Sequence, residues 1–167
     1  TAGQSEADDL TIATSAHTGM TIRSGATSKG AVYFSDGTSG NNEYRGVLEY
    51  NHSDDHFRIL TAASERLRIT SDGLVGIGND NPDTLLHLQS NNPILKFTDA
   101  NQATDNKSWN ITAGQTQLLR IQAINDSGTG GGQLFDFYRI DNNVTEFRGM
   151  KQGSPWFTIK NDDEKVG

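Results

Sequence analysis

Residues 65–88 of the chain, ERLRITSDGLVGIGNDNPDTLLHL, contain the clearest structural pattern in the sequence. Apolar and polar residues alternate on both sides of Ser71-Asp72-Gly73, which is typical of two short strands joined by a tight turn, because Asp and Gly tolerate a positive φ. A corner at 78–82, rich in Asn and containing a Pro, leads to a third alternating run at 86–88. The stretch therefore predicts three short β-strands.

Two glycines, Gly76 and Gly78, flank Ile77 within this stretch. Val75 and Ile77 then project to one side of their strand, and the other side carries almost no side chain. A strand that is bare on one side suits a place where another backbone comes very close. We interpret residues 65–88 as a joint between modules that has no catalytic chemistry.

The run LRITSDGLVGIG, with the Asn/Asp/Pro corner and LHL after it, resembles a recurring linker motif of bacteriophage tail fibres. The motif occurs in particular in fibres whose precursors end in an intramolecular chaperone of the endosialidase type. The usual pattern, G-x-V-G-I-G-T-x-x-P, has Thr where this chain has Asn79. The resemblance covers residues 67–88 closely and the flanking segments loosely. It implies a homotrimeric, all-β adhesin located on the virion as an extracellular tail or appendage fibre, in contact with other fibre or tail proteins.

The composition is polar for a chain of 167 residues: 33% of them are hydrophobic, and 18 are Gly. Such a chain either forms a thin core of many short strands or buries area against neighbouring subunits. The net charge of −7 argues against nucleic-acid binding, which needs clustered Lys and Arg. No apolar run approaches the length of a membrane span, so we expect no membrane insertion. The absence of Cys excludes disulfides. Because the chain starts at Thr1 rather than Met, we expect a piece of a longer protein or a processed product.

Short apolar runs separated by turn formers recur along the whole chain and predict an all-β fold with little helix. Before the joint we expect strands at 10–12, 20–22, 31–34, 44–50 and 57–60, and after it at 94–97, 109–111, 118–123 and 134–140.

The second half of the chain repeats the plan of the first. Residues 86–88 align with 10–12, 76 residues earlier, and 157–163 align with 67–73, 90 residues earlier. Longer loops at 127–132 and 149–155 would absorb the difference. Self-similarity at this period is typical of an array of modules. We expect a lead-in at 1–9, a first module at 10–64, the joint at 65–88, a second module at 89–156 and the start of a further joint at 157–167.

Three copies wound about one axis would bury the thin apolar faces that short strands cannot bury alone. The expected fold is thus an elongated homotrimeric fibre of small sandwich-like or prism-like β modules joined by interwoven strands. The candidate trimer-interface residues are Leu67, Ile69, Val75, Gly76, Ile77, Gly78, Leu86 and Leu88.

No motif in the chain specifies an enzyme. The glycine order at 73–78 does not fit a dinucleotide fingerprint, and no G-x-S-x-G elbow occurs. Linear spacing does not pair Asp36, Glu49, Asp136 or Glu146 as glycosidase carboxylates. His52 and His56 lie in a turn and lack helical metal-site geometry. We expect no catalytic residue, no cofactor and no metal.

Receptor contacts are expected from aromatic and basic residues near flexible loops, because binding residues favour loops held on a rigid scaffold. The candidates are Tyr138, Arg139 and Trp156. Together with the resemblance, they favour a structural and receptor-binding fibre segment that adheres to bacterial surface polysaccharide or lipopolysaccharide. Two alternatives stay open: a purely structural shaft without a receptor site, and a segment of a polysaccharide-depolymerising tailspike.

Overall fold

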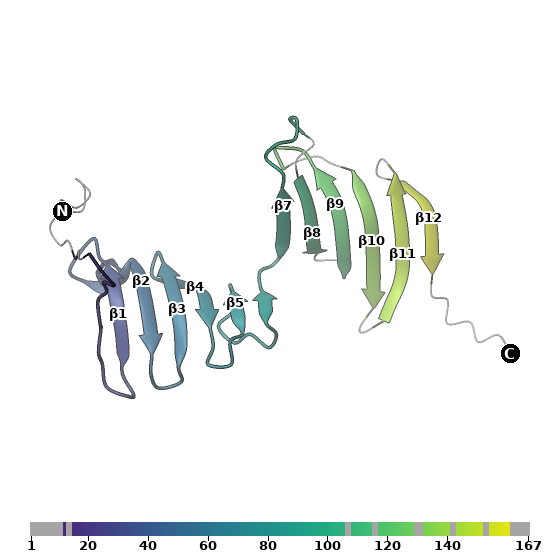
Figure 1. Cartoon of the computed structure of the whole chain (residues 1–167). Coiled ribbons are helices and arrows are strands. Elements are labelled where there is room, and N and C mark those ends of the chain that lie inside the picture. Colours follow the sequence, from purple (N-terminus) through teal and green to yellow (C-terminus); the bar gives the residue numbers. More distant parts are fainter. Residues whose placement is uncertain are drawn as a thin grey trace. The chain divides into compact units, whose positions relative to one another are not determined.

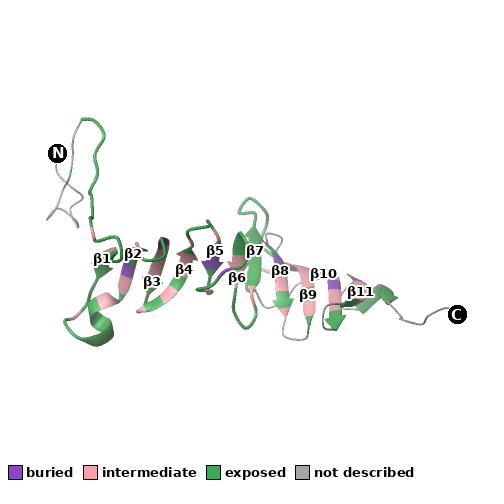
Figure 2. Cartoon of the chain, turned by 90° about the horizontal axis from the view of Figure 1, so that it is seen from below, coloured by how far each residue is buried: buried purple, intermediate pink, exposed green. Residues whose placement is uncertain are grey.

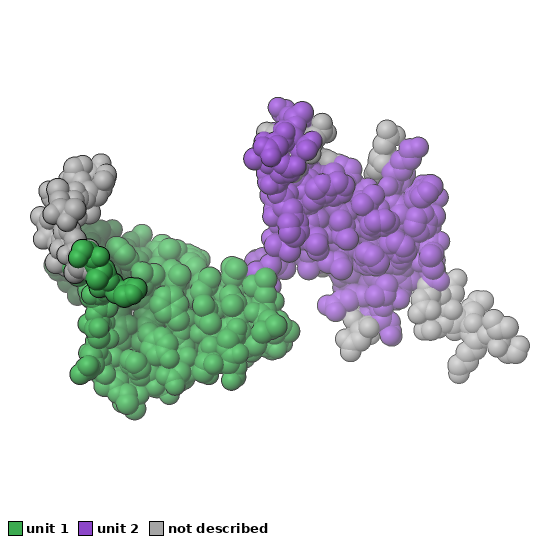
Figure 3. All heavy atoms as spheres, in the orientation of Figure 1, with its two compact units in different colours: residues 1–87 green, residues 88–167 purple. Residues whose placement is uncertain are grey.

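A computed structural model describes residues 12, 15–105, 108–114, 117–128, 132–140, 143–151 and 154–160. The chain divides into two compact units, Thr1–His87 and Leu88–Gly167 (Figure 3). In the described residues, the regular structure is β-strand apart from one 3-10 turn, η1 (Gly40–Tyr44). The all-β prediction is confirmed.

The first unit contains one six-stranded sheet whose strands follow one another in chain order (Figure 1). Neighbouring strands from the first to the fifth pair antiparallel, and the sixth lies beside the fifth. Tight turns between alternating segments favour such a meander. The strands are β1 (Lys29–Phe34), β2 (Gly46–Asn51), β3 (His56–Thr61), β4 (Ser64–Ile69), β5 (Val75–Ile77) and β6 (Leu86–Leu88).

The hairpin predicted around Ser71-Asp72-Gly73 joins β4 to β5. Gly73 has a φ of +80°, and its N–H donates to the carbonyl of Thr70 at 2.9 Å. The N–H of Thr70 donates in turn to the carbonyl of Leu74 at 3.0 Å. Gly adopts this left-handed conformation without a steric cost. The turn therefore forms at Gly73, where the sequence pattern predicted it.

The second unit is also a six-stranded meander, and all of its neighbouring strands pair antiparallel. Its strands are β7 (Ile94–Thr98), β8 (Ser108–Gly114), β9 (Leu118–Ile124), β10 (Gln133–Ile140), β11 (Asn143–Lys151) and β12 (Ser154–Lys160).

Neither unit has a second layer in the part of the chain that the structure describes. Val47 and Ile124, which are 2% and 6% exposed, are the buried hydrophobic residues found there. Figure 2 shows that most described residues are half-buried or exposed. Neither unit forms a sandwich by itself, because each contains one sheet in its described residues. Most apolar side chains stay half-buried or exposed.

The two units share one hairpin in the same register. In β3–β4, Ile59 pairs with Leu67 and Thr61 with Ser64, and the extra residue between them makes a β-bulge. In β11–β12, Gly149 pairs with Phe157 and Lys151 with Ser154, again with a bulge. Every one of these positions is displaced by 90 residues, so residues 157–159 pair as 67–69 do; residues 161–163 of the expected alignment lie outside the described residues.

Three sequence-based expectations differ from the structure. Residues 20–22 form no strand; instead Ile22 lies against Gly30 of β1, where a Cβ at Gly30 would be 3.3 Å from the Ile22 side chain. The expected loop at 149–155 belongs largely to β11 and β12, because Gly149–Lys151 continue the ladder. The 44–50 strand begins later, at Gly46, because Tyr44 lies in η1.

Other expected segments have defined places. The joint at 65–88 supplies β4, β5 and β6 of the first sheet, and the division between the units falls at its end. Residues 1–9, most of the strand expected at 10–12, and 161–167 lie outside the described residues.

Candidate functional site

Each sheet has an apolar face and a polar face, because successive side chains of a strand point to opposite sides. The pairing register places the apolar residues of neighbouring strands in rows across each sheet. In the first unit the apolar face comprises Val32, Leu48, Ile59, Leu67 and Ile77, with Tyr50, Phe57, Ile69 and Val75. In the second unit it comprises Leu95, Ile111, Ile121, Phe135 and Phe157, with Ala113, Leu119, Phe137, Phe147 and Ile159.

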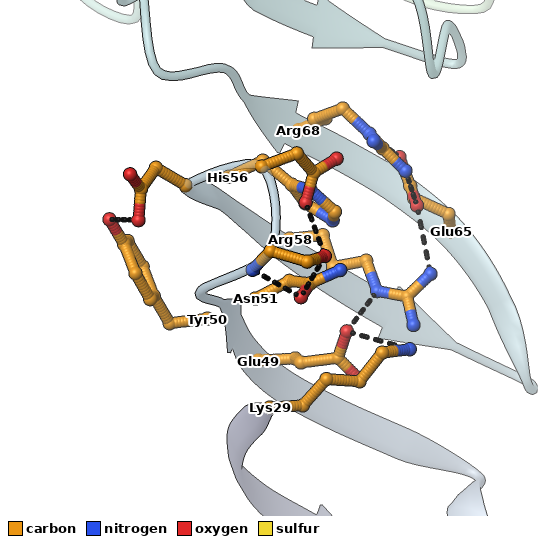
Figure 4. Close-up of polar contacts among 11 residues, drawn as sticks. Lys29, Glu49, Tyr50, Asn51, His56, Arg58, Glu65 and Arg68 are labelled. Carbon is orange, nitrogen blue, oxygen red and sulfur yellow. Dashed lines mark hydrogen bonds and ion pairs between the residues drawn. The ribbon is translucent and has the colours of Figure 1, made fainter. Parts of the chain in front are cut away.

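A chain of ion pairs crosses the polar face of the first sheet from β1 to β4 (Figure 4). Glu49 Oε1 accepts from Arg58 Nε at 2.7 Å and lies 3.4 Å from Lys29 Nζ. Glu65 accepts from Arg68 through both oxygens, at 2.7 and 2.8 Å, and from Arg58 Nη1 at 3.4 Å. Positive and negative groups alternate along the row, so each carboxylate is held between two cations.

These contacts keep both carboxylates ionised. Burial raises the pKa of Glu49, but the hydrogen bond and charge of Arg58, with the charge of Lys29, outweigh it, so the pKa lies below its usual value. The hydrogen bonds from Arg68 are the main reason that the pKa of Glu65 is lowered. Glu49 is only 3% exposed, so its partners are essential to the charge. The arrangement suits cross-strand stabilisation rather than proton donation.

A corresponding carboxylate lies on the polar face of the second sheet. Asp136 of β10 is 0% exposed and forms a bidentate pair with Arg120 of β9, with N–O distances of 2.7 and 2.8 Å. Asp136 pairs in register with Arg148, and Glu49 pairs in register with Arg58, which lies 90 residues before Arg148. Arg148 donates to Glu146 at 2.6 Å. Both units thus bury one carboxylate on the polar face and hold it with arginine.

Two of the three receptor-contact candidates lie together. Tyr138 and Arg139, at the end of β10, line an open hollow of about 470 Å³ whose other walls include Leu119, Phe137 and Val144. The Arg148 guanidinium lies 4.5 Å from the centre of the Tyr138 ring and covers one of its faces. Arg139 is exposed. The hollow combines apolar walls with one exposed cation, which suits a ligand that has an apolar surface and polar substituents.

Trp156, the third candidate, does not line that hollow. It is the bulged residue of β12 and is 73% exposed, with its ring 5.4 Å from that of Phe157. A Cβ at Gly149 would collide with both rings, so the absence of a side chain there makes room for them. Trp156 therefore extends the apolar face of the second sheet.

The structure places the expected interface residues on different sides of the first sheet. Four of them, Leu67, Ile69, Val75 and Ile77, belong to the apolar face as defined above. Gly76 points to the opposite side, where a Cβ would collide with the carbonyl oxygen of Asn79 and approach Pro82. The backbone that passes close to Gly76 is thus the corner of the same chain, not a neighbouring copy. Gly78 has a φ of +71° in this corner; Leu86 is exposed and Leu88 half-buried.

A cluster of phenylalanines on the second sheet was not singled out from the sequence. Phe147 of β11 stacks on Phe137 at 4.7 Å between ring centres and lies 5.5 Å from both Phe135 and Phe157. The spacing Phe135-x-Phe137 is a period-two signal that could have indicated this face. Phe147 was missed because its strand, β11, was not predicted.

Comparison with models of known protein families found no match, and comparison with curated proteins found no significant match. In the ranges that the structure describes, no helix is long and apolar enough to cross a membrane. No group of three or more potential metal ligands occurs among the same residues.

Proposed function

We propose that the chain is a structural and receptor-binding segment of a phage tail or virion fibre, assembled as a homotrimer. The residues of the 67–88 motif support the fibre class through their resemblance to tail-fibre linkers. The single-layer structure of each unit supports the trimer, and it is the observation that carries the proposal. A single-layer sheet with one apolar face does not bury enough surface to be stable by itself.

The repeated organisation supports an elongated assembly. Two meanders with an equivalent hairpin follow each other at 90 residues, as modules do in an array. A closed threefold ring would let such an array grow along one axis without growing sideways. The oligomeric state is tested by sedimentation equilibrium: a trimer has three times the chain mass of 18.1 kDa. A stable monomer would overturn the proposal.

The adhesive part of the proposal rests on the hollow at the end of β10. Its apolar walls and exposed Arg139 suit a sugar ring that carries an anionic group, as in many bacterial surface polysaccharides. Weak sites repeated in three copies would bind together through their high effective concentration.

The test uses immobilised capsular polysaccharides and lipopolysaccharides. The trimer should bind at least one of them, and Tyr138→Ala or Arg139→Ala should weaken binding by tenfold or more while leaving the trimer intact. Glu43→Gln, an exposed position in the other unit, serves as the control. Absence of binding across a broad panel would favour a shaft without a receptor site, and release of reducing ends would favour a depolymerase. Either result overturns the adhesive role.

A further inference from the structure

The two faces of each sheet differ in whether their side chains find partners within the same unit. On the polar face, Glu49, Glu65, Asp136 and Glu146 all have arginine partners in the same unit. Their charges are compensated without any other molecule. The rows of the apolar face contain no charged residue, and a second layer is absent over them in the described part of the chain.

The polar faces are more buried than the apolar faces. Glu49 and Asp136, on the polar faces, are 3% and 0% exposed, and the buried aliphatic residues Val47 and Ile124 lie there too. Ile77 and Ile159, on the apolar faces, are 45% and 62% exposed. Folded proteins normally bury aliphatic side chains and expose carboxylates. Contiguous apolar surface of this kind marks an interaction surface, for which another protein is one usual occupant.

We infer that the apolar face of both units is the surface buried between copies of this chain, and that the polar face with its ion pairs points outward. The inference rests on the proposed homotrimer and specifies which side of each sheet faces the axis. It extends the interface from the short strands of residues 65–88 to the apolar rows of both sheets, except at the end of β10, where the hollow lined by Tyr138 and Arg139 stays open. Gly76 lies on the outward side.

The repeat identifies a second copy, rather than an unrelated protein, as the cover. The apolar face recurs on the two equivalent hairpins, β3–β4 and β11–β12, at the same 90-residue displacement. Another copy of the chain presents the same apolar face on each unit by construction, so one kind of partner is enough to cover both. Apolar faces are also mutually compatible in any rotational symmetry, because they carry no charges that would meet like charges.

The energetics favour association. Burying half-exposed apolar side chains is favourable because it removes apolar surface from water. Each copy offers two rows of such residues in each unit, and their burial offsets the motional freedom lost on association. The gain from the polar face, whose carboxylates are already buried and paired, would be much smaller.

The absence of cysteine allows a direct test with single cysteine variants of the full chain. Phe34 and Tyr33 are neighbours on β1 with similar exposure, 58% and 55%, but point to the apolar and polar sides respectively. Ile159 and Thr158 form the same kind of pair on β12, and both are exposed. The variants are Phe34→Cys, Tyr33→Cys, Ile159→Cys and Thr158→Cys, each treated with a short thiol cross-linker after its mass has been measured.

Phe34→Cys and Ile159→Cys should cross-link between copies at least tenfold more efficiently than their matched polar-side partners. Cross-linking that is equal on both sides, or stronger from Tyr33→Cys and Thr158→Cys, would overturn the inference while leaving the trimer in place. A monomeric mass for the unmodified chain would instead overturn the proposed assembly itself. The two failures are therefore distinguishable. A cysteine substitution can itself break the trimer. If only the apolar-side variant of a pair loses the trimer mass, the result supports the inference. If only the polar-side variant loses it, the result contradicts the inference.

Discussion

At the scale of single residues, Gly76 shows how a sequence signal acquires its physical meaning. The bare side of its strand indicates that another backbone passes close, and the structure identifies that backbone as the Asn79 corner. The corner can close because Gly78 adopts a positive φ and Asn79 Oδ1 accepts from the N–H of Asn81 at 2.8 Å. Gly76 therefore stabilises one chain through close packing.

Replacing Gly76 with Ala should destabilise the first unit. The added Cβ would overlap the Asn79 carbonyl, and overpacking of this kind costs about 1–3 kcal/mol. Urea unfolding of the trimer at fixed protein concentration measures the loss. Gly19→Ala is the matched control, because nothing lies within 4 Å of a Cβ at Gly19. Equal stability of the two variants would show that the corner moves away at no cost.

At the scale of elements, the ion-pair row across β1 to β4 should make the first sheet sensitive to acid. The folded pKa of Glu49 and of Glu65 lies below the usual value of 4.5. Such groups contribute stability that is fully present above pH 4.5 and is lost as the pH falls through the folded pKa. The free energy of unfolding should therefore decrease steadily below about pH 4.5.

Glu49→Gln tests the source of this sensitivity. The variant should be less stable than the original chain at pH 7, because Arg58 loses its closest partner, and its stability should fall less steeply in the acid range. Denaturant unfolding at a series of pH values between 7 and 3 measures both effects. Glu43→Gln, at an exposed position in η1, should leave the profile unchanged. Parallel profiles for the Glu49 and Glu43 variants would contradict the assignment.

The elements also show what sequence patterns can and cannot predict. The β4–β5 hairpin was predicted because one turn residue, Gly73, requires a positive φ. The strand at 143–151 was missed because it is defined by its pairing with β10 and β12, which linear spacing does not reveal. For the same reason the pairing of Asp136 with Arg120 appears only once β9 and β10 are in register. Alternation within a strand is a local property, whereas the site depends on register.

At the scale of the whole molecule, the proposed trimer would cover the apolar faces that a single unit leaves uncovered. Each unit pairs its buried carboxylates with arginine internally and leaves its apolar face uncovered, so we expect folding and assembly to be coupled. Stability should then depend on protein concentration, because association stabilises only the folded chains.

Ile77→Asp tests this coupling. Ile77 lies on the apolar face, and threefold symmetry would bring three carboxylates into an apolar environment, where an uncompensated buried charge costs about 3–5 kcal/mol. Sedimentation equilibrium should show dissociation to monomers at concentrations where the original chain is a trimer. Tyr33→Asp places the same charge on the polar side at a similarly exposed position and should keep the trimer. A trimer that survives Ile77→Asp would mean that β5 lies away from the axis, and the interface would then have to be built from the other strands of the two sheets.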